Sequence, residues 1–510
     1  MHYTSLFQTR GRPKSQIQVK MQDKPQLEDA KRALLDRLLS GNTVPIADKI
    51  PRIVRRASSV PAPLSCNQEQ VYWHAQLAGR FAPDSRLYNE TITIHRTGTL
   101  ALEVLERSLV EILRRHEAWR TTFDQMNGQL VQRVHAVPEL HLGVVDLRNL
   151  PESERERTAL EIGQVGAQQP FDLAEGPLLR FQLVRLSELE HRLFVTAHQI
   201  VLDGVSAYHV FLPELVALYE AFVSGNPSPL PEPPVQYSDY AHWQRNNLQN
   251  GALSEHLNYW RKQLGAHAPT LRMPTDHPRP EVQTFRGAIQ PFAMGTSLSD
   301  AARALTRAEG TTLFVTYLAA FVILLSGYTG QKELVIGTVA TTRNTAEVQR
   351  LLGYFLNPVV LYFRLAGHVT FRGVLRHVHE VVVDALSHGE MPFHLLVDTA
   401  QAETDLSRNP LYQVQFSLEP PIPPLYPGWN LTPMDLQSGG AKLDLYLVLD
   451  DRPSGTFGRL QYNPELFEAA SMQRMARHYQ SLLETATTDP ETKLSDLAQY
   501  SFCDEFPLVR

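Results

Sequence analysis

The segment 196–209, TAHQIVLDGVSAYH, brings two histidines, an aspartate, a serine and a glycine close together in the sequence. Residues before His198 alternate as in a strand, and Asp203-Gly204 predicts a turn into a helix. A carboxylate at such a turn is costly to bury without a cation. Gly204 allows close backbone approach, and the helix N-terminus behind it offers N–H groups to an oxyanion. Gln199 stands apart, because a carboxamide does not titrate and cannot be a general base near neutral pH.

A predicted β-hairpin over residues 178–200 positions this segment. The runs LLRFQLVRL and RLFVTAHQI flank the polar turn SELEH. Because strand side chains alternate, Leu193, Val195 and Ala197 are expected on one face, and Phe194, Thr196 and His198 on the other.

Further elements surround the hairpin in two segments of similar size. The first contains a predicted helix at 101–123 and a β-rich stretch at 129–147. The proline-rich run 226–234 then predicts a semi-rigid connector. The second segment alternates helices (301–327, 367–386, 465–485) with strands (333–339, 357–364, 411–418, 442–449, 457–462). Two α/β lobes of this kind form a cleft between them, where ligands usually bind.

Composition gives no reason to expect nucleic acid or a membrane as partner. The chain has 510 residues and a net charge of −6. The apolar stretch 311–327 is short for a membrane span and predicts a buried helix. Two distant cysteines, Cys66 and Cys503, predict no disulfide framework and fit a reducing cytoplasm. The run HVHE at 377–380 favours a solvated helix face over a metal site, since adjacent helical residues splay apart.

The chain predicts four parts: a basic segment (1–57), an N-terminal lobe (58–230), a C-terminal lobe (231–497) and a tail (498–510). The basic segment suits either a small hairpin followed by an amphipathic helix or a disordered tail. In the first case it would dock on an acidic partner.

Nine stretches in order resemble the core motifs of the condensation domains of non-ribosomal peptide synthetases. They are LSCNQEQVYW (64–73), RRHEAWRTTF (114–123), PFDLAEGPLLR (170–180), AHQIVLDGVS (197–206), YSDYAHW (237–243), YTGQKELVIGT (328–338), LLGYFLNPVVLYFR (351–364), HGEMPFHLLVD (388–398) and DLSRNPLYQVQFSL (405–418). The resemblance covers about residues 60 to 497. It implies an α/β (α+β) fold of two chloramphenicol-acetyltransferase-like lobes in a V-shaped pseudo-dimer, with a tunnel between them.

The resemblance also implies an activity and its partners. An acyl donor on the phosphopantetheine arm of an acyl or peptidyl carrier protein would meet a small-molecule amine or alcohol acceptor, giving an amide or an ester. No cofactor of the enzyme's own is implied. We expect a monomer that reaches its carrier through the basic N-terminal segment.

The family's active-site pattern, His-His-x-x-x-Asp-Gly, assigns roles to several residues. His198 matches the first histidine, which is mainly structural, but Gln199 replaces the second, which acts as base or positions the nucleophile. Asp203 is expected to pair with Arg343 as a scaffold. Tyr354 and Asn357 resemble family residues near the tunnel. Ser206 is expected to add a hydroxyl on the substrate side, and His209, about one helical turn beyond the motif, either faces the tunnel or does not. His116 and Arg120 belong to the second motif and are expected to be structural. Pro358 and Val205 stand where the family often has threonine and tryptophan.

Three interpretations of Gln199 stay open. The enzyme is active and Gln199 orients the nucleophile, which suits an amine best because about a tenth of an α-amine is neutral at pH 7. Alternatively, the chain is a non-catalytic module that recruits carriers or tailoring enzymes, or the glutamine was introduced to block turnover. The donor could also be an acyl-coenzyme A. Partner domains are not evident in the sequence, which favours a free-standing enzyme over a segment of a larger synthetase.

Overall fold

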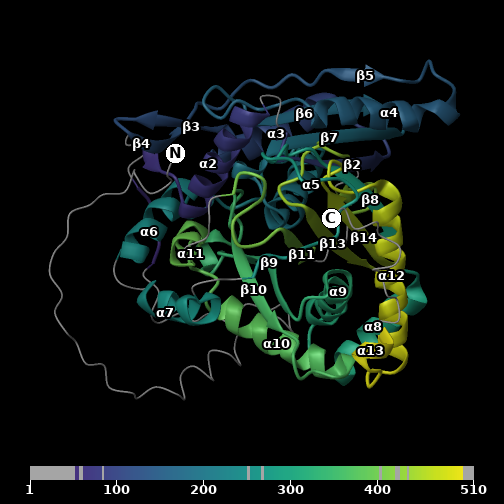
Figure 1. Ribbon diagram of the computed structural model, residues 1–510. Helices are drawn as coiled ribbons and strands as arrows, with labels where there is room; N and C mark the ends of the chain where they lie inside the picture. Colours follow the sequence, from purple (N-terminus) through teal and green to yellow (C-terminus); the bar gives the residue numbers. More distant parts are fainter. Residues whose placement is uncertain are drawn as a thin grey trace. The chain divides into compact units, whose positions relative to one another are not determined.

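The computed structural model describes residues 52–56, 61–82, 86–249, 253–265, 269–400, 405–419, 426–433 and 436–497 (Figure 1). These residues belong to one compact unit that begins at Pro45. The hairpin and helix expected within residues 1–41 lie outside the described residues, as does the tail 498–510. The α/β fold class predicted from the sequence is confirmed by the mixture of helices and sheets described next.

The predicted hairpin forms the centre of a five-stranded sheet. Strand β6 (Leu179–Arg185) pairs antiparallel with β7 (Glu190–His198), and β7 pairs on its other side with β2 (Asn89–Thr97). The edges are β5 (Val144–Asp146) and β12 (Trp429–Pro433). A separate three-stranded sheet joins β1 (Ala62–Pro63), β4 (Gln129–Val134) and β3 (Thr121–Met126).

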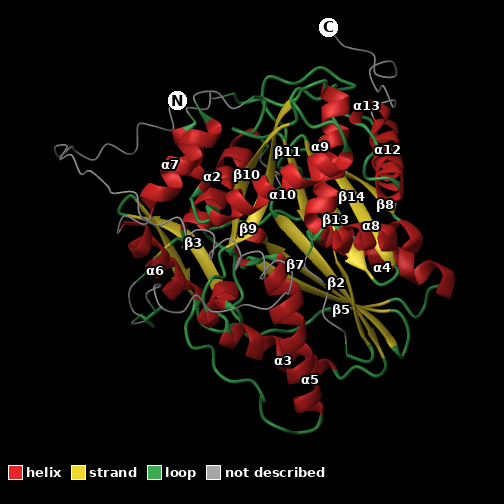
Figure 2. Ribbon diagram, turned by 90° about the horizontal axis from the view of Figure 1, so that it is seen from below, coloured by secondary structure: helices red, strands yellow, loops and turns green. Residues whose placement is uncertain are grey.

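The two faces of the five-stranded sheet are covered by different helices. Val195 and Leu193 pack in the same core as α3 (Leu102–Arg115) and α5 (Leu212–Val223), which lie side by side (Figure 2). Phe194 packs on the opposite side with α4 (Glu152–Ala167). The alternation predicted for this strand is therefore confirmed.

A six-stranded sheet organises the second half of the chain. Its order is β10 (Leu356–Arg364), β9 (Glu333–Thr341), β11 (Val414–Leu418), β13 (Leu445–Arg452), β14 (Gly455–Tyr462) and β8 (Ala288–Ala293). The helices α8 (Thr296–Ala308), α9 (Leu313–Thr329), α10 (Phe371–Ser387) and α12 (Ala469–Thr488) pack with it around one large core (Figure 1).

The chain also forms the helices α2 (Cys66–Phe81), α6 (Tyr237–Gln249) and α7 (Leu253–Leu264), and the shorter α11 (Phe393–Thr399) and α13 (Leu494–Leu497). Helix α2 begins with a capping box, in which the side chains of Ser65 and Gln68 each accept a hydrogen bond from the other's backbone N–H.

Strand β12 links the two halves of the chain. It follows β11 in sequence but pairs antiparallel with β2, so a segment of the second half completes the sheet of the first. Trp429 is buried there, with the guanidinium of Arg96 4.9 Å from its ring centroid. The lobe boundaries, the V shape and the tunnel stay predictions.

Two predicted helices have different bounds in the structure. The helix expected over 101–123 ends at Arg115, and residues 121–126 form β3 instead. The helix expected over 301–327 is two helices, α8 and α9. Gly310, with φ of 61°, follows the end of α8, and the hydroxyl of Thr312 caps α9 by accepting from the backbone N–H of Val315.

No single helix among the described residues is long and apolar enough to cross a membrane. Of the helices that the structure describes, one pair, α8 and α9, has the length and composition when taken together, and the two are bent by 107° at their break. The apolar residues of α9 are buried in the protein core, as the sequence predicts for this segment.

Candidate functional site

The chemistry-bearing segment follows directly on β7. The strand ends at His198, a short 3₁₀ turn spans Gln199–Val201, and the next helix begins at Gly204. Two backbone hydrogen bonds hold the strand end, because the His198 N–H donates to the Leu178 carbonyl at 3.0 Å and the Gln199 N–H donates to the Tyr88 carbonyl at 2.8 Å. The predicted strand, turn and helix are therefore all present, and the side chain of residue 199 starts from a fixed backbone position.

His198 is buried and neutral in this arrangement. Its Nδ1 accepts a hydrogen bond from the Ile200 N–H at 3.2 Å, so the proton of the neutral ring is on Nε2. Burial, with a smaller contribution from the nearby Lys442 cation, lowers the pKa of His198 to about 3. A cavity lined in part by His198, Phe171 and Tyr88 adjoins the ring. These contacts agree with the structural role that the sequence suggests for this histidine.

Gln199 is half-buried and contacts a lysine that lies 243 positions further along the chain. The Nζ of Lys442 donates a hydrogen bond to Oε1 of Gln199. The same Nζ lies 3.6 Å from a carboxylate oxygen of Glu90 and 4.6 Å from the ring centroid of Tyr88. Burial lowers the pKa of Lys442, and the Glu90 carboxylate opposes this change.

The sheet geometry explains why Glu90 and Gln199 share this lysine. Glu90 lies opposite Ala197 in the β2–β7 register, whereas Asn89 lies opposite His198. Side chains on a strand alternate between faces, so Glu90 is on the face opposite to His198. Asn89, on the His198 face, donates to the carbonyls of Ala167 and Gln169 at the end of α4. Lys442 shortly precedes β13 of the other sheet, so this contact joins the two sheets.

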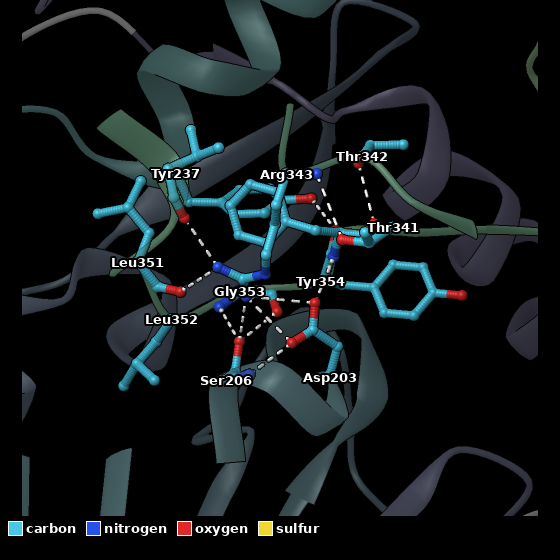
Figure 3. Close-up of polar contacts among 12 residues, drawn as sticks. Asp203, Ser206, Tyr237, Thr341, Thr342, Arg343, Leu351, Leu352, Gly353 and Tyr354 are labelled. Atoms are coloured by element: carbon cyan, nitrogen blue, oxygen red, sulfur yellow. Dashed lines mark hydrogen bonds and ion pairs between the residues drawn. The ribbon is translucent and has the colours of Figure 1, made fainter. Parts of the chain in front are cut away.

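Asp203 and Arg343 form the ion pair that the sequence predicts (Figure 3). Nη2 of Arg343 lies 3.0 and 3.2 Å from the two carboxylate oxygens of Asp203. The backbone N–H groups of Ser206 and Phe355 also donate to the carboxylate, at 2.6 and 3.0 Å. The Asp203 side chain is fully buried and that of Arg343 is 2% exposed, so the pair is a connection inside the protein rather than a group open to substrate.

Ser206 has no hydrogen-bonding capacity left for a substrate, contrary to expectation. Its Oγ accepts from Arg343 Nη2 at 2.7 Å and from the Gly353 N–H at 3.1 Å, and it donates to the Gly353 carbonyl at 2.8 Å. A hydroxyl has one donor and two acceptor positions, and all three are used. Ser206 therefore extends the ion pair into the loop before β10.

The other end of Arg343 fixes the same loop. Nη1 donates to the carbonyls of Val348 and Leu351, at 2.8 and 2.9 Å, and the guanidinium carbon lies 4.0 Å from the ring centroid of Phe355. Asp203 belongs to the turn after Gln199, while Arg343 and Phe355 lie between β9 and β10. The cluster thus locks the turn of one sheet to the strand connection of the other.

The remaining predicted site residues have different environments. Asn357 is buried in β10, and its Nδ2 donates to the carbonyls of Gly389 and Met391 at 2.8 and 2.7 Å, so its donors serve the fold instead of a substrate. Tyr354 is buried, and its ring points away from the ion pair (Figure 3). His209 is exposed on the helix after Gly204, between the buried Tyr208 and Val210.

His116 and Arg120 have structural contacts, as expected. Nε2 of His116 lies 2.9 Å from the carboxylate of Glu214 in α5, and Arg120 donates to the Leu113 carbonyl.

The two histidines of the HVHE run have separate partners. Nδ1 of His379 forms a hydrogen bond with the hydroxyl of Thr311, and Nε2 of His377 accepts a hydrogen bond from the backbone N–H of Arg364. Both rings are half-buried, so the run is less solvated than predicted. No group of three or more His, Cys, Asp or Glu side chains in the described ranges is arranged to hold a metal ion.

Sequence analysis missed the charged residues that surround Gln199. Lys442 and Glu90 are single charges in otherwise ordinary strand patterns, and their proximity depends on how the two sheets pack. A further buried charge without a sequence signal is Glu419, which follows β11 in the other sheet. It lies 3.7 Å from Arg459, and burial raises the pKa of Glu419 to about 7 although this arginine opposes the change. No local signal in the sequence would have identified these residues.

Gln199 and Lys442 together can supply hydrogen-bond donors to a substrate, but Gln199 cannot act as a general base. Because Lys442 carries only donors, it must face the carboxamide oxygen of Gln199, which leaves the two N–H donors of Gln199 Nε2 directed away from Lys442. An amide N–H can stabilise a carbonyl oxygen that gains negative charge. It cannot remove a proton.

Comparison with known proteins places this geometry in a family. The condensation domain family matches residues 60–502. One of the linear gramicidin synthase proteins of Brevibacillus parabrevis is 40% identical over 432 residues, which are 84% of this chain and 6% of that synthase protein. The chain therefore spans only a small part of this relative's length.

Solved structures agree with this match. The X-domain from teicoplanin biosynthesis has a TM-score of 0.75 and 26% identity, over 88% of this chain and 99% of the X-domain. The SgcC5 protein of Streptomyces globisporus has a TM-score of 0.74 and 27% identity, over 84% of this chain and all of SgcC5. The family match covers most of the chain, and the Asp203–Arg343 ion pair after β7 agrees with the family's active-site motif. The chain therefore belongs to the condensation domains of non-ribosomal peptide synthetases.

Proposed function

We propose that the chain is an active acyltransferase in non-ribosomal peptide or hybrid polyketide biosynthesis. It moves an acyl group from the phosphopantetheine thioester of an acyl or peptidyl carrier protein to an amine or alcohol acceptor. With an amine, the nitrogen attacks the thioester carbonyl carbon, a C–N bond forms and the C–S bond breaks. The pantetheine sulfur takes the proton that the nitrogen gives up, so the products are an amide and a free thiol.

The observation that carries the proposal is the placement of the Gln199 side chain. It is half-buried after β7, on a backbone fixed by Tyr88, and Lys442 binds its oxygen. A thioester needs reactants held together and an oxyanion stabilised more than it needs a strong base. Gln199 suits the second of these tasks, and the buried Asp203–Arg343 pair suits the task of holding its turn in place.

The absence of a titrating group at residue 199 favours amines over alcohols. An α-amine has a pKa of roughly 8, so about a tenth of it is already neutral at pH 7, whereas an alcohol must lose its proton during attack. Amide formation is therefore the main activity that we propose, with ester formation slower.

The test is a comparison of matched acceptors. Acyl-loaded carrier protein is incubated with the protein and either an amine or the alcohol of the same carbon skeleton, with acyl-coenzyme A as a second donor and Gln199→His and Gln199→Ala as variants. We expect amide from the carrier-bound donor, and a drop of about 100-fold in Gln199→Ala. If the rate with acyl-coenzyme A equals the rate with the loaded carrier protein, the donor is acyl-coenzyme A and not the carrier-bound thioester. If neither the native protein nor Gln199→His makes an amide or ester, the proposal is wrong.

A second candidate function is a binding module without turnover. Gln199 cannot serve as a base, and the X-domain, which is similar in structure, has been solved in a complex with OxyB from teicoplanin biosynthesis. A module of this kind would bind a carrier protein or a tailoring enzyme and would stay inactive after histidine is restored.

The basic N-terminal segment supports a separate proposal about the carrier. Arg10, Arg12, Lys14 and Lys20 carry positive charge with no acidic residue before position 20. Electrostatic attraction of this kind speeds encounter with an acidic partner. We therefore propose that the carrier protein docks on this segment. We also propose that the protein is cytoplasmic and monomeric.

A further inference from the structure

A half-buried cation, the ammonium group of Lys442, lies beside Gln199. Lys442 lies just before β13, more than 240 positions from Gln199, and three independent contacts hold its Nζ. They come from the carboxamide of Gln199, the carboxylate of Glu90 and the ring of Tyr88. The side chain of a surface lysine is flexible and strongly hydrated, so its ammonium group has no fixed position. Three contacts on one ammonium group, in contrast, hold it in place.

These contacts decide which end of the carboxamide is available. A glutamine side chain presents an acceptor at Oε1 and two donors at Nε2, and it can turn to exchange them. Lysine has three donors and no acceptor, so its contact with Gln199 is favourable only when Oε1 faces Nζ. Without Lys442, either orientation would be open to the side chain.

We propose that Lys442 is a positioning residue that holds Gln199 so that its Nε2 hydrogens, and not its oxygen, face the reacting carbonyl, with Glu90 anchoring Lys442. This inference rests on the proposed acyl transfer and deepens it. In the tetrahedral intermediate the former carbonyl oxygen carries negative charge, and the Nε2–H bond stabilises that oxygen. Gln199 is then the residue that touches the reacting atoms, and Lys442 acts through it.

The opposite orientation would be unfavourable for the same step. A carboxamide oxygen directed at a developing oxyanion repels it, so each molecule with Gln199 reversed would be inactive. Glu90 contributes by compensating the charge of Lys442, because a half-buried ammonium without a carboxylate is costly and tends to move toward water.

The kinetic test is a set of single and double variants. Lys442→Met keeps the aliphatic stem, Glu90→Gln keeps the shape of the anchor, and Gln199→Glu keeps the contact with Lys442 while replacing the NH₂ donor by an acceptor oxygen. Lys262→Met, at an exposed lysine of α7, is the matched control.

We expect Lys442→Met to lower kcat by about 10- to 100-fold and to change the KM of the acceptor less than threefold. Gln199→Glu should lower kcat by about 100-fold or more, which is the usual effect of losing one oxyanion donor. Lys442→Met in a Gln199→Ala background should have less than a threefold effect, since no carboxamide is left to orient. Equal effects of Lys442→Met in both backgrounds, or full activity of Gln199→Glu, would overturn the proposal.

A measurement without turnover separates this inference from the proposed function. The side-chain NH₂ resonances of Gln199 are assigned by their loss in Gln199→Ala and then followed in Lys442→Met. A fixed carboxamide gives two distinct proton signals, and we expect these to shift or broaden in Lys442→Met but not in Lys262→Met. An unchanged spectrum would overturn the positioning role, even if the native protein is active. A changed spectrum in a protein without turnover would keep the positioning role and reject the acyltransferase.

Discussion

Removal of Arg343 should reveal how strongly the two halves of the site are joined. In Arg343→Met, the carboxylate of Asp203 keeps its hydrogen bonds from the backbone N–H groups of Ser206 and Phe355 but loses its cation. The Asp203 side chain is fully buried, so its charge becomes uncompensated away from water. Breaking a buried pair from one side typically costs about 3–5 kcal/mol.

Arg343→Met also loses other contacts, which should place its loss of folding free energy in the upper part of the range of about 3–5 kcal/mol. Nη1 of Arg343 also satisfies the carbonyls of Val348 and Leu351, which would be left without this donor. In Asp203→Asn/Arg343→Met both charges are absent. We therefore expect the double variant to be more stable than the sum of the two single effects predicts, by about 2 kcal/mol or more.

Urea denaturation measures both effects. With a slope of about 3 kcal/mol per molar urea, a loss of about 3–5 kcal/mol lowers the midpoint by about 1–1.7 M. Arg303→Met, which breaks the more exposed pair with Asp451, is a suitable comparison, and we expect it to cost about 1 kcal/mol or less. A midpoint shift for Arg343→Met no larger than that for Arg303→Met, or additivity in the double variant, would show that the Asp203–Arg343 pair is not a strong connection between the two sheets.

Three other predictions concern pH, packing and docking. Burial lowers the pKa of His198 from 6.5 to about 3. Below pH 6.5 the histidine is therefore protonated in the unfolded chain but stays neutral in the folded protein, so the free energy of unfolding falls as the pH drops. Between pH 7 and pH 5 this group accounts for about 2 kcal/mol, so chemical denaturation at the two pH values should find a loss of stability about 2 kcal/mol smaller in His198→Asn than in the native protein. Part of the loss remains in the variant because burial also lowers the pKa of His74 to about 4, and an equal loss in both proteins would contradict the prediction. In Gly337→Ala a Cβ would meet the Tyr412 ring at 2.2 Å, and we expect a loss of about 1–3 kcal/mol that Tyr412→Leu partly relieves; an unchanged melting temperature would contradict this. Deletion of residues 1–40 should weaken carrier binding in a salt-dependent way while far-UV circular dichroism and the melting transition persist, whereas unchanged affinity would exclude docking through this segment.

Local patterns were sufficient to predict most of the strands. The stretches 333–339 and 357–364 correspond to β9 and β10 within two residues at each end, because alternation and β-branched residues act locally. The helix boundary at Gly310 was also present in the sequence, as a glycine followed by a capping threonine. It was missed because the apolar pattern continues across the break.

The site was predictable where its residues lie in one segment and not elsewhere. His198, Gln199 and Asp203 are neighbours in sequence, and the resemblance to a family supplied Arg343. Lys442, in contrast, reaches Gln199 only because two sheets pack together, and single-sequence patterns carry no information about that distance. The same limitation explains Ser206, whose hydroxyl is used by a loop that lies about 150 residues later.

Acyl transfer by a site with glutamine at position 199 is the activity on which the other proposals depend. The most direct measurement is a single turnover, in which carrier protein loaded with a labelled acyl thioester is mixed with excess native protein and an amine, and the amide is quantified by mass spectrometry. We expect amide formation well above the rate without protein, and about 100-fold less with Gln199→Ala. If the native protein binds the loaded carrier but leaves the thioester as stable as it is alone, the chain is not an acyltransferase.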